Sequence, residues 1–385
     1  MQRIAGLLVL ALFLPQIPAQ AAPKAGSSCK SVGELIKSNG KTLLCVKSGQ
    51  KKIWKVQAAV PLKPPASPTP TISSSASPSP ASTAPEKPTG FDDLVEKSQG
   101  IALQVWNVTR KPILSGKVIS TPRDVYIGPN TTVTNPQYQT DFATASKLWS
   151  AYNQPKQYIV IYNNFTDIDW AKSLGAAQTG KSVDFEINMN CSAQRCSGAN
   201  ANIGTPNMIN FGINPNNSQA YFLNGGIEAH EFTHLVQFSQ FDDNRSALYN
   251  EYFRAPCWFR EGQAHFGGLV SAAATFMEYQ NNRKDWLRTG ASGLLTDFEK
   301  TTILSFLNNS CQDKSGHVYD AGFFAVEALS AVAGATSSMD LLKEMAAGKS
   351  FDAAFTSTYG KSQSELLPIV AEAVSRQFKK QKGIS

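Results

Sequence analysis

The chain has 385 residues, a formal net charge of +7 and a hydrophobic content of 42%. With 17% charged and 10% aromatic residues, this composition fits a globular protein with a sizeable core and excludes a wholly disordered chain. The length allows one large domain with smaller pieces, or roughly two to three modest domains.

The first 22 residues predict a secretory signal peptide. Arg3 precedes an apolar run of 11 residues, Ile4 to Leu14, and the small-residue site Ala19-Gln20-Ala21 follows. This order is typical of a cleaved leader. The alternative is an uncleaved membrane anchor, but a spanning helix needs roughly 20 apolar residues. We therefore expect residues 1–22 to be removed and the mature protein to be secreted and extracellular, either free or associated with the cell envelope.

The cysteine count also indicates an oxidising compartment. An even number of cysteines in an exported chain suggests disulfides. The spacing favours three pairs, although sequence alone does not prove them: Cys29 with Cys45, Cys191 with Cys196, and Cys257 with Cys311. A zinc site built from cysteines is the alternative, and the lack of any C-x-x-C pair disfavours it.

Residues 23–56 predict a small cysteine-linked β module. Asn39-Gly40 lies between apolar stretches, which is a strong hairpin signal, and strands are expected over 41–47 and 51–56. Domains below about 40 residues usually need a cross-link. In its pattern "GKT…CVKSG…W", the segment is similar to small Cys-containing modules of exported actinobacterial proteins. That resemblance carries no chemistry that can be transferred.

This module is basic, and a spacer follows it. Residues 24–56 hold eight lysines against one acid, Glu34, which equals the formal excess of the whole chain. Such a patch predicts contact with an anionic cell-wall or membrane surface rather than with nucleic acid, or it serves only solubility. Residues 57–90 are rich in Pro, Ser, Thr and Ala, and this composition predicts an extended linker.

Residues 91–380 predict one α+β domain, with a mixed sheet in its first part and helices in its second. The run 91–108 predicts a short helix or an extended lead-in. Period and composition predict helices over 141–154, 225–241 and 257–280, and strands over 157–165 and 207–214. From residue 319 onward the chain predicts helices broken at Gly334, Gly348 and Gly360. Strands before helices is the order typical of an α+β fold.

The sequence "HEFTH" points to a metal ion. On a helix, positions four apart share a face, so His230 and His234 can aim both imidazoles at one point. Glu231 lies to one side, where it can take a proton from water at the open position of a zinc ion. The alternative is a surface helix with two incidental histidines. The neighbouring "LVQF" favours burial instead, and a buried histidine pair without a partner would be costly.

A second motif carries a resemblance to a known family. Trp258 to Ala264 reads W-x-x-E-G-x-A, with Glu261 placed 27 residues after His234. H-E-x-x-H followed by this pattern resembles gluzincin zinc metallopeptidases of the peptidase-MA-like kind. The resemblance spans roughly residues 155–375, including 319–334 and 349–367. It implies a zincin-like fold, Zn²⁺ bound by His230, His234 and Glu261, and Glu231 as the general base.

The resemblance also implies the remaining parts of the site. Tyr319 or His317 would stabilise the oxyanion, and a peptide or protein substrate would pair with an edge strand, for which residues 207–213 are the candidate. One position departs from the family: His265 stands where such enzymes often carry an acidic or small residue that braces a zinc histidine. His265 would either brace a ligand or act as a fourth ligand that closes the site.

Two functions follow. The first is a secreted zinc peptidase that hydrolyses peptide bonds through zinc-activated water and the Glu231 base. The second is a non-catalytic cell-envelope binding protein that uses a zincin scaffold. The complete ligand set with a general base favours the enzyme. Endopeptidase and aminopeptidase action both stay open, since no G-x-M-E-N motif for binding an N-terminus occurs.

Overall fold

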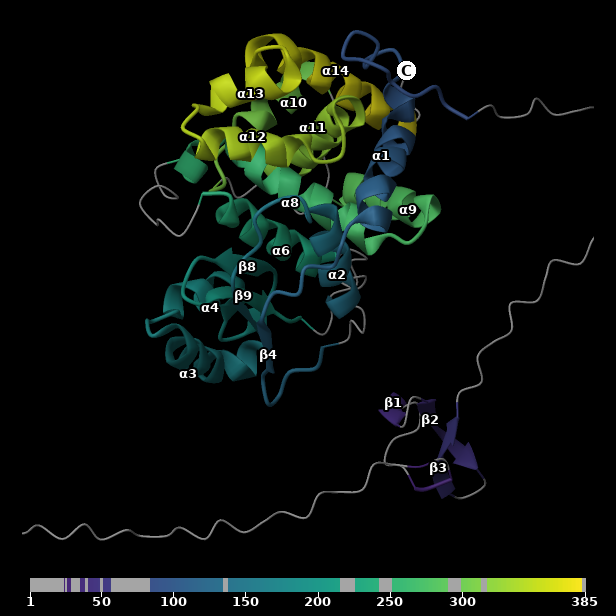
Figure 1. The fold of residues 1–385 in the computed structure, drawn as a ribbon, viewed down its shortest axis with the longest axis vertical. Helices are drawn as coiled ribbons and strands as arrows, with labels where there is room; N and C mark the ends of the chain where they lie inside the picture. The colour runs from purple at the N-terminus through teal and green to yellow at the C-terminus, as the bar shows by residue number, and fades with distance from the viewer. Residues whose placement is uncertain are drawn as a thin grey trace, which may run out of the picture. The chain divides into compact units, whose positions relative to one another are not determined.

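The computed structural model of the protein describes residues 24, 26–28, 35–38, 41–48, 51–56, 84–133, 138–214, 226–241, 251–289, 299–312 and 317–382. The chain divides into two compact units, Met1–Pro80 and Ala81–Ser385 (Figure 1). The boundary falls within the segment predicted as a linker. The predicted signal peptide lies outside the described residues.

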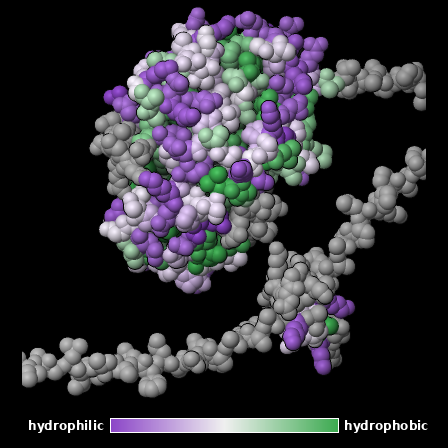
Figure 2. Space-filling model, viewed as in Figure 1, coloured by the Kyte–Doolittle hydropathy of each residue, from purple (hydrophilic) through white to green (hydrophobic). Residues whose placement is uncertain are grey.

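The smaller unit contains an antiparallel sheet of three strands within its described residues, in the order β1 (Leu35–Ser38), β2 (Lys41–Ser48) and β3 (Lys51–Val56). Ser38 pairs with Lys41, so only Asn39-Gly40 connects the first two strands, as the hairpin signal predicts. Trp54 is buried, whereas the described lysines of β3 are exposed, and the few residues of this unit that carry a hydropathy colour in Figure 2 are mainly hydrophilic. The predicted Cys29–Cys45 bond involves Cys29, which lies outside the described ranges.

Four strands of the larger unit form a mixed sheet in the order β4 (Arg123–Ile127), β5 (Tyr158–Asn163), β9 (Asn207–Gly212) and β8 (Ala199–Asn202), and β6 (Cys191–Ser192) and β7 (Arg195–Cys196) pair separately. β4, β5 and β9 are parallel, and β8 runs antiparallel to β9. The expectation that residues 207–213 form an edge strand is therefore wrong, because β9 is paired on both sides. β8 is the edge strand beside it.

Helices cover both faces of this sheet. α3 (Ile168–Thr179) and α4 (Asp184–Asn190) pack on one face, and α2 (Tyr138–Leu148) and α6 (Gly226–Ser239) on the other. Strands and helices therefore alternate in this half, and the expected order of strands before helices is too simple. Parallel strands cannot be joined by tight turns, so the chain must cross over between them, and helices supply the crossovers.

The remaining helices form the second half of the unit (Figure 1). They are α1 (Ile101–Ser115), α8 (Cys257–Ala272), α9 (Phe276–Thr289), α10 (Lys300–Leu307), α11 (His317–Ala333), α12 (Ser337–Ala346), α13 (Phe351–Tyr359) and α14 (Gln363–Lys382). Short 3-10 turns η1 (Ser98–Gly100) and η3 (Tyr252–Arg254) precede α1 and α8, and η2 (Phe165–Asp167) precedes α3 beside the sheet. The breaks predicted at Gly334, Gly348 and Gly360 are confirmed, each glycine having a positive φ.

The single helix expected over 257–280 is in fact two. α8 ends at Ala272, and the carboxylate of Glu278 accepts from the Thr275 backbone N–H at 3.3 Å while Thr275 Oγ1 accepts from the Glu278 N–H at 3.2 Å. This reciprocal pattern is a capping box, which starts α9 as a separate helix. Within the described chain no single helix passes for a membrane span; one pair, α11 and α12, passes by length and composition together but is bent by 97°.

Glycines set how closely α8 lies against its neighbours. A Cβ on Gly262 would stand 2.3 Å from the backbone of Gly322 in α11, and one on Gly267 would stand 2.4 Å from the Thr233 hydroxyl in α6. Only residues without side chains permit such close approach. α8 is thereby packed directly between α6 and α11, and α6 and α8 together contribute most of the site described next.

Candidate metal centre

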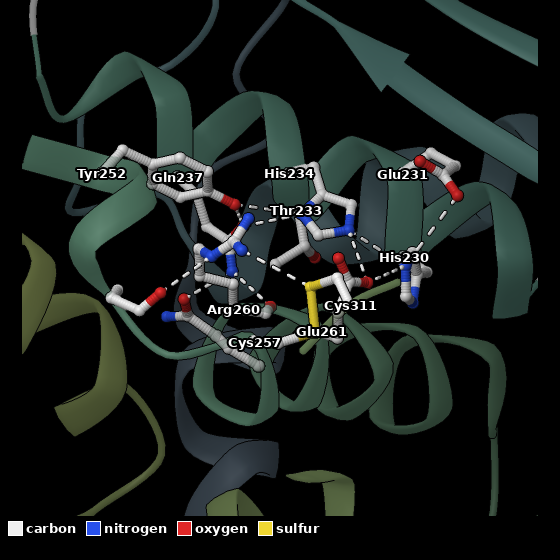
Figure 3. A network of polar contacts seen from close by, with 12 residues as sticks. His230, Glu231, Thr233, His234, Gln237, Tyr252, Cys257, Arg260, Glu261 and Cys311 are labelled. Carbon is white, nitrogen blue, oxygen red and sulfur yellow. Dashed lines mark hydrogen bonds and ion pairs between the residues drawn. A yellow bond between two sulfur atoms is a disulfide. The ribbon is translucent and has the colours of Figure 1, made fainter. Parts of the chain in front are cut away.

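Three side chains from two helices converge on one point in the larger unit. His230 and His234 lie four apart on α6, a helix that is buried on nearly all sides, and Glu261 lies on α8. His234 Nε2 is 3.1 Å from His230 Nε2 and 3.2 Å from Glu261 Oε2, and His230 Nε2 is 3.5 Å from the same carboxylate oxygen (Figure 3). The sequence motifs therefore do bring their residues together.

The donor atoms of this triad suit a metal ion. They lie within 4.8 Å of one another, and two imidazole nitrogens with one carboxylate oxygen form a set that leaves a further coordination position open. Glu261 also lies near Cys257 and Cys311, but those two sulfurs are bonded to each other and are not available as thiolates. The metal-binding group is thus His230, His234 and Glu261.

Charges in the triad are balanced by an ion pair. Burial lowers the pKa of His234, but the Glu261 carboxylate overrides this and raises it to about 9. Burial raises the pKa of Glu261, yet the two histidines hold it well below its usual range. Burial lowers the pKa of His230 to about 4, so this ring is neutral at pH 7. A cation entering the triad must therefore displace the Nε2 proton of His234.

Glu231 occupies the position expected of a general base. Its side chain is buried, and its Oε1 lies 3.8 Å from His230 Nε2. Burial raises its pKa to about 8, against the opposing effects of the His234 cation and the Ala201 backbone N–H. The effect of that N–H places the carboxylate beside β8. Glu231 therefore lies between the triad and the edge strand of the sheet.

Gln237 fixes the orientation of His234. Its Oε1 accepts from His234 Nδ1 and from the Tyr252 hydroxyl, both at 2.7 Å. Its amide nitrogen donates to the Arg260 carbonyl at 2.9 Å and to Gln263 Oε1 at 2.7 Å (Figure 3). Because the acceptor holds a proton on Nδ1, the Nε2 atom is the one that faces the triad and can bind a metal.

His265 does not join the triad. Its ring lies edge-on to that of His230, with centroids 4.4 Å apart, and its nitrogens fall outside the metal-binding group. Burial is the main cause that lowers the pKa of His265 well below its usual value, so the ring is neutral. In this structure His265 packs against a ligand without closing the centre.

The two residues expected for oxyanion stabilisation lie in different surroundings. Tyr319 borders the same cleft as the triad, and the Glu261 charge, together with burial, raises its pKa, so its hydroxyl keeps its proton. His317, the first residue of α11, packs on Phe306 with ring centroids 4.5 Å apart. His317 is not among the residues that line the cleft.

The cleft itself has a volume of about 620 Å³ and opens onto the triad. One side is β8 with α4, another is η3 with the start of α8, and α6 forms the floor with its two histidines and Glu231. Two disulfides lie near these walls: Cys191–Cys196 directly after α4, and Cys257–Cys311 at the start of α8. These two disulfides confirm two of the three cysteine pairs that the sequence spacing predicted.

Comparisons with protein-family models, with curated proteins and with solved structures gave no match for this chain. What the centre does is therefore inferred from the chemistry of its own side chains.

Sequence reasoning missed several residues that build the centre. Gln237 is three residues after His234, so helix geometry alone places it on the ligand face, and its signal was present. Tyr252 reaches the site only through the packing of η3, and no local pattern marks it. The same is true of the β8 edge and of Phe185 and Met189 on α4, which line the cleft from a distant part of the chain.

Proposed function

We propose that this chain is a secreted zinc-dependent peptidase of the gluzincin type, with a zincin-like fold. The observation that carries the proposal is the convergence of His230, His234 and Glu261 in a cleft that also holds Glu231. Two nitrogen donors, one carboxylate and a neighbouring second carboxylate form the set needed for metal-assisted hydrolysis.

His230, His234 and Glu261 would hold the metal, and a zinc ion there would supply a Lewis acid that acidifies water and polarises a carbonyl oxygen. Glu231 accepts the proton of the attacking water. It then delivers that proton to the amine that leaves, as a general acid. Its burial suits this double role, because a carboxylate whose pKa is raised toward neutrality both accepts and donates protons near pH 7.

Tyr319 acts as the donor to the oxyanion that develops on the substrate carbonyl. Its hydroxyl stays protonated because the Glu261 charge and burial raise its pKa, and it borders the cleft. A positioned donor of this kind commonly contributes a factor of about 10² to 10³ to kcat. The placement of His317 on Phe306 favours Tyr319 over His317 for this role.

β8 supports an extended substrate. It is an edge strand whose residues Ala199–Asn202 line the cleft, and the N–H of Ala201 partly opposes the burial that raises the pKa of Glu231. A peptide that pairs with this edge would pass beside the triad, since strand addition at a free edge is a common mode of peptide binding. The two disulfides accord with secretion into an oxidising compartment.

The basic β module is proposed to hold the enzyme at an anionic cell-wall or membrane surface. Lys51, Lys52 and Lys55 are exposed on β3, and no nucleic acid is needed to explain them. The Pro/Ser/Thr-rich segment after it gives the catalytic unit reach. Salt-dependent sedimentation of the full chain with cell-wall polymer or anionic vesicles, compared with a triple Lys→Gln variant of β3, tests this part.

The decisive experiment combines metal content with hydrolysis. We expect about one zinc per purified chain by elemental analysis, and cleavage within a broad library of quenched fluorescent peptides. Glu231→Gln should keep the zinc and lose nearly all activity. Tyr319→Phe should lower kcat by roughly 10²-fold with little change in KM.

A matched control lies on the same helix. Glu228 is a buried carboxylate three residues before Glu231 and does not line the cleft, so Glu228→Gln should keep both zinc and activity. One zinc with no activity in any variant would favour the non-catalytic scaffold. A chain that binds no zinc contradicts both functions.

A further inference from the structure

The cleft is lined by two groups of apolar side chains that come from separate parts of the sequence, and three of these side chains, Phe185, Met189 and Phe253, are exposed. Building on the proposed function, we propose that the site selects peptide segments with large apolar side chains beside the scissile bond. α4 supplies one wall and η3, backed by α6, supplies the other. The metal triad lies at the floor between them.

The first wall consists of Phe185 and Met189. They stand four apart on α4 and therefore share one helix face, and both line the cleft. Their exposed fractions are 74% and 59%, although the neighbouring Ile187 on the same helix is completely buried against the sheet. The helix thus uses one apolar face for the core and presents a second apolar face to the cleft beside β8.

The second wall is a series of aromatic rings that begins at a metal ligand. His234 stacks on Phe238 with centroids 6.2 Å apart, and Phe238 contacts Tyr252 at 5.0 Å. Tyr252 in turn contacts Phe253 at 5.0 Å, and Phe253 is 43% exposed. The Arg260 guanidinium lies 5.0 Å from the Phe253 ring and holds it in place. An apolar surface therefore runs from the triad to the rim.

The exposed apolar residues Phe185, Met189 and Phe253 differ from ordinary ones because they share one location. Single exposed apolar residues are common, and the face in Figure 2 shows them scattered among hydrophilic ones. Here Phe185, Met189 and Phe253 instead line one cleft together with the triad and the edge strand β8. An extended peptide paired with β8 places alternate side chains on opposite sides, so its large residues would contact these walls.

Binding rather than turnover tests this proposal, so that its outcome is separate from that of the proposed function. The probes are two tripeptide hydroxamates, one with Leu and Phe side chains and one with glycines only. Their Kd values are measured by calorimetry on the zinc-loaded full chain. We expect the Leu/Phe hydroxamate to bind at least about tenfold more tightly, the scale expected for apolar pockets.

In the double variant Phe185→Gln/Met189→Gln, the Kd of the Leu/Phe hydroxamate should rise by roughly tenfold, which removes most of the preference. The Kd of the glycine hydroxamate should stay unchanged. Glutamine has similar length and helix propensity, so α4 should be retained. Met277→Gln is the matched control, because Met277 is 68% exposed on α9 and lies outside the cleft. It should keep the full preference.

Two results overturn the proposal while the metallopeptidase stands: equal binding of both hydroxamates by the zinc-loaded wild type, or an unchanged preference in the double variant. If the double variant instead changes only the sedimentation coefficient of the chain, the α4 face is a contact between copies and the proposal is wrong. Failure to bind zinc at all removes both this proposal and the function on which it rests.

Discussion

Replacing Gln237 by Leu should weaken zinc binding without moving either helix that carries the ligands. Gln237 is fully buried, and its Oε1 accepts from both His234 and Tyr252. Leucine leaves these two donors without an acceptor in the core, at about 1–3 kcal/mol each, so we expect a loss of roughly 2–6 kcal/mol in unfolding free energy. The His234 ring also loses the bond that orients it.

The change in metal affinity follows from that lost orientation. Removing the hydrogen-bond partner of a metal-binding histidine typically lowers affinity by about 10- to 100-fold. Gln237→Glu retains an acceptor for His234 and should therefore keep most of the affinity, although the lost donors to Arg260 and Gln263 lower stability. Competition with a chromophoric chelator measures zinc affinity, and urea titration measures stability.

Gln240 provides the matched control on the same helix. It is also buried, but it bonds to Asn153 and to the Val236 carbonyl, away from the triad. Gln240→Leu should therefore lower the free energy of unfolding and leave zinc affinity unchanged. The reasoning is refuted if Gln237→Leu binds zinc as tightly as wild type, or if Gln240→Leu loses as much affinity.

Three further predictions concern stability. For the metal-free chain, the free energy of unfolding should fall as pH rises from 6.5 to 9, because His234 with a pKa near 9 keeps a proton that the unfolded chain has released. His234 alone contributes up to about 1.4 kcal/mol per pH unit, and Glu231, whose pKa is raised to about 8, adds to this fall until about pH 8; a flat profile of unfolding free energy from urea titration would contradict this. Gly262→Ala should lower the free energy of unfolding by about 1–3 kcal/mol or more, because the added Cβ would lie 2.3 Å from the α11 backbone. Chemical denaturation measures this change, and an unchanged midpoint would show that the contact is absent. Replacing Cys257 and Cys311 by serine removes a cross-link between residues 54 apart in sequence and should lower the free energy of unfolding by about 2–4 kcal/mol in the same measurement. An unchanged free energy would show that the disulfide does not form in the folded chain.

Local patterns predicted the elements and ligands that depend on sequence spacing. His230 and His234 are four apart on a helix, and the glycines after α11, α12 and α13 end those helices as expected. The Asn39-Gly40 hairpin follows from the same kind of local signal. These features depend on residues close together in the chain, where backbone geometry leaves few choices.

Features that depend on tertiary packing were not predicted. The composition of residues 207–213 fits an edge strand and a central strand equally well. Only the pairing of β9 with both β5 and β8 shows that it is central. Tyr252 and Phe185 reach the cleft from separate elements, and nothing in their local sequence marks that destination. The helix break before α9 carried a readable signal in Thr275 and Glu278, but the apolar period on either side obscured it.

The helices that carry the metal ligands belong to the main hydrophobic core. Phe232 and Leu235 of α6 and Trp258 and Phe266 of α8 are buried in the same cluster. Burial of these side chains brings the donors together, in contrast to small zinc modules that fold only around their ion. Folding and metal acquisition can therefore occur as separate events, in different places. If the chain is the zinc peptidase proposed above, the fraction of active molecules depends on the metal supply and not on the amount of folded protein alone.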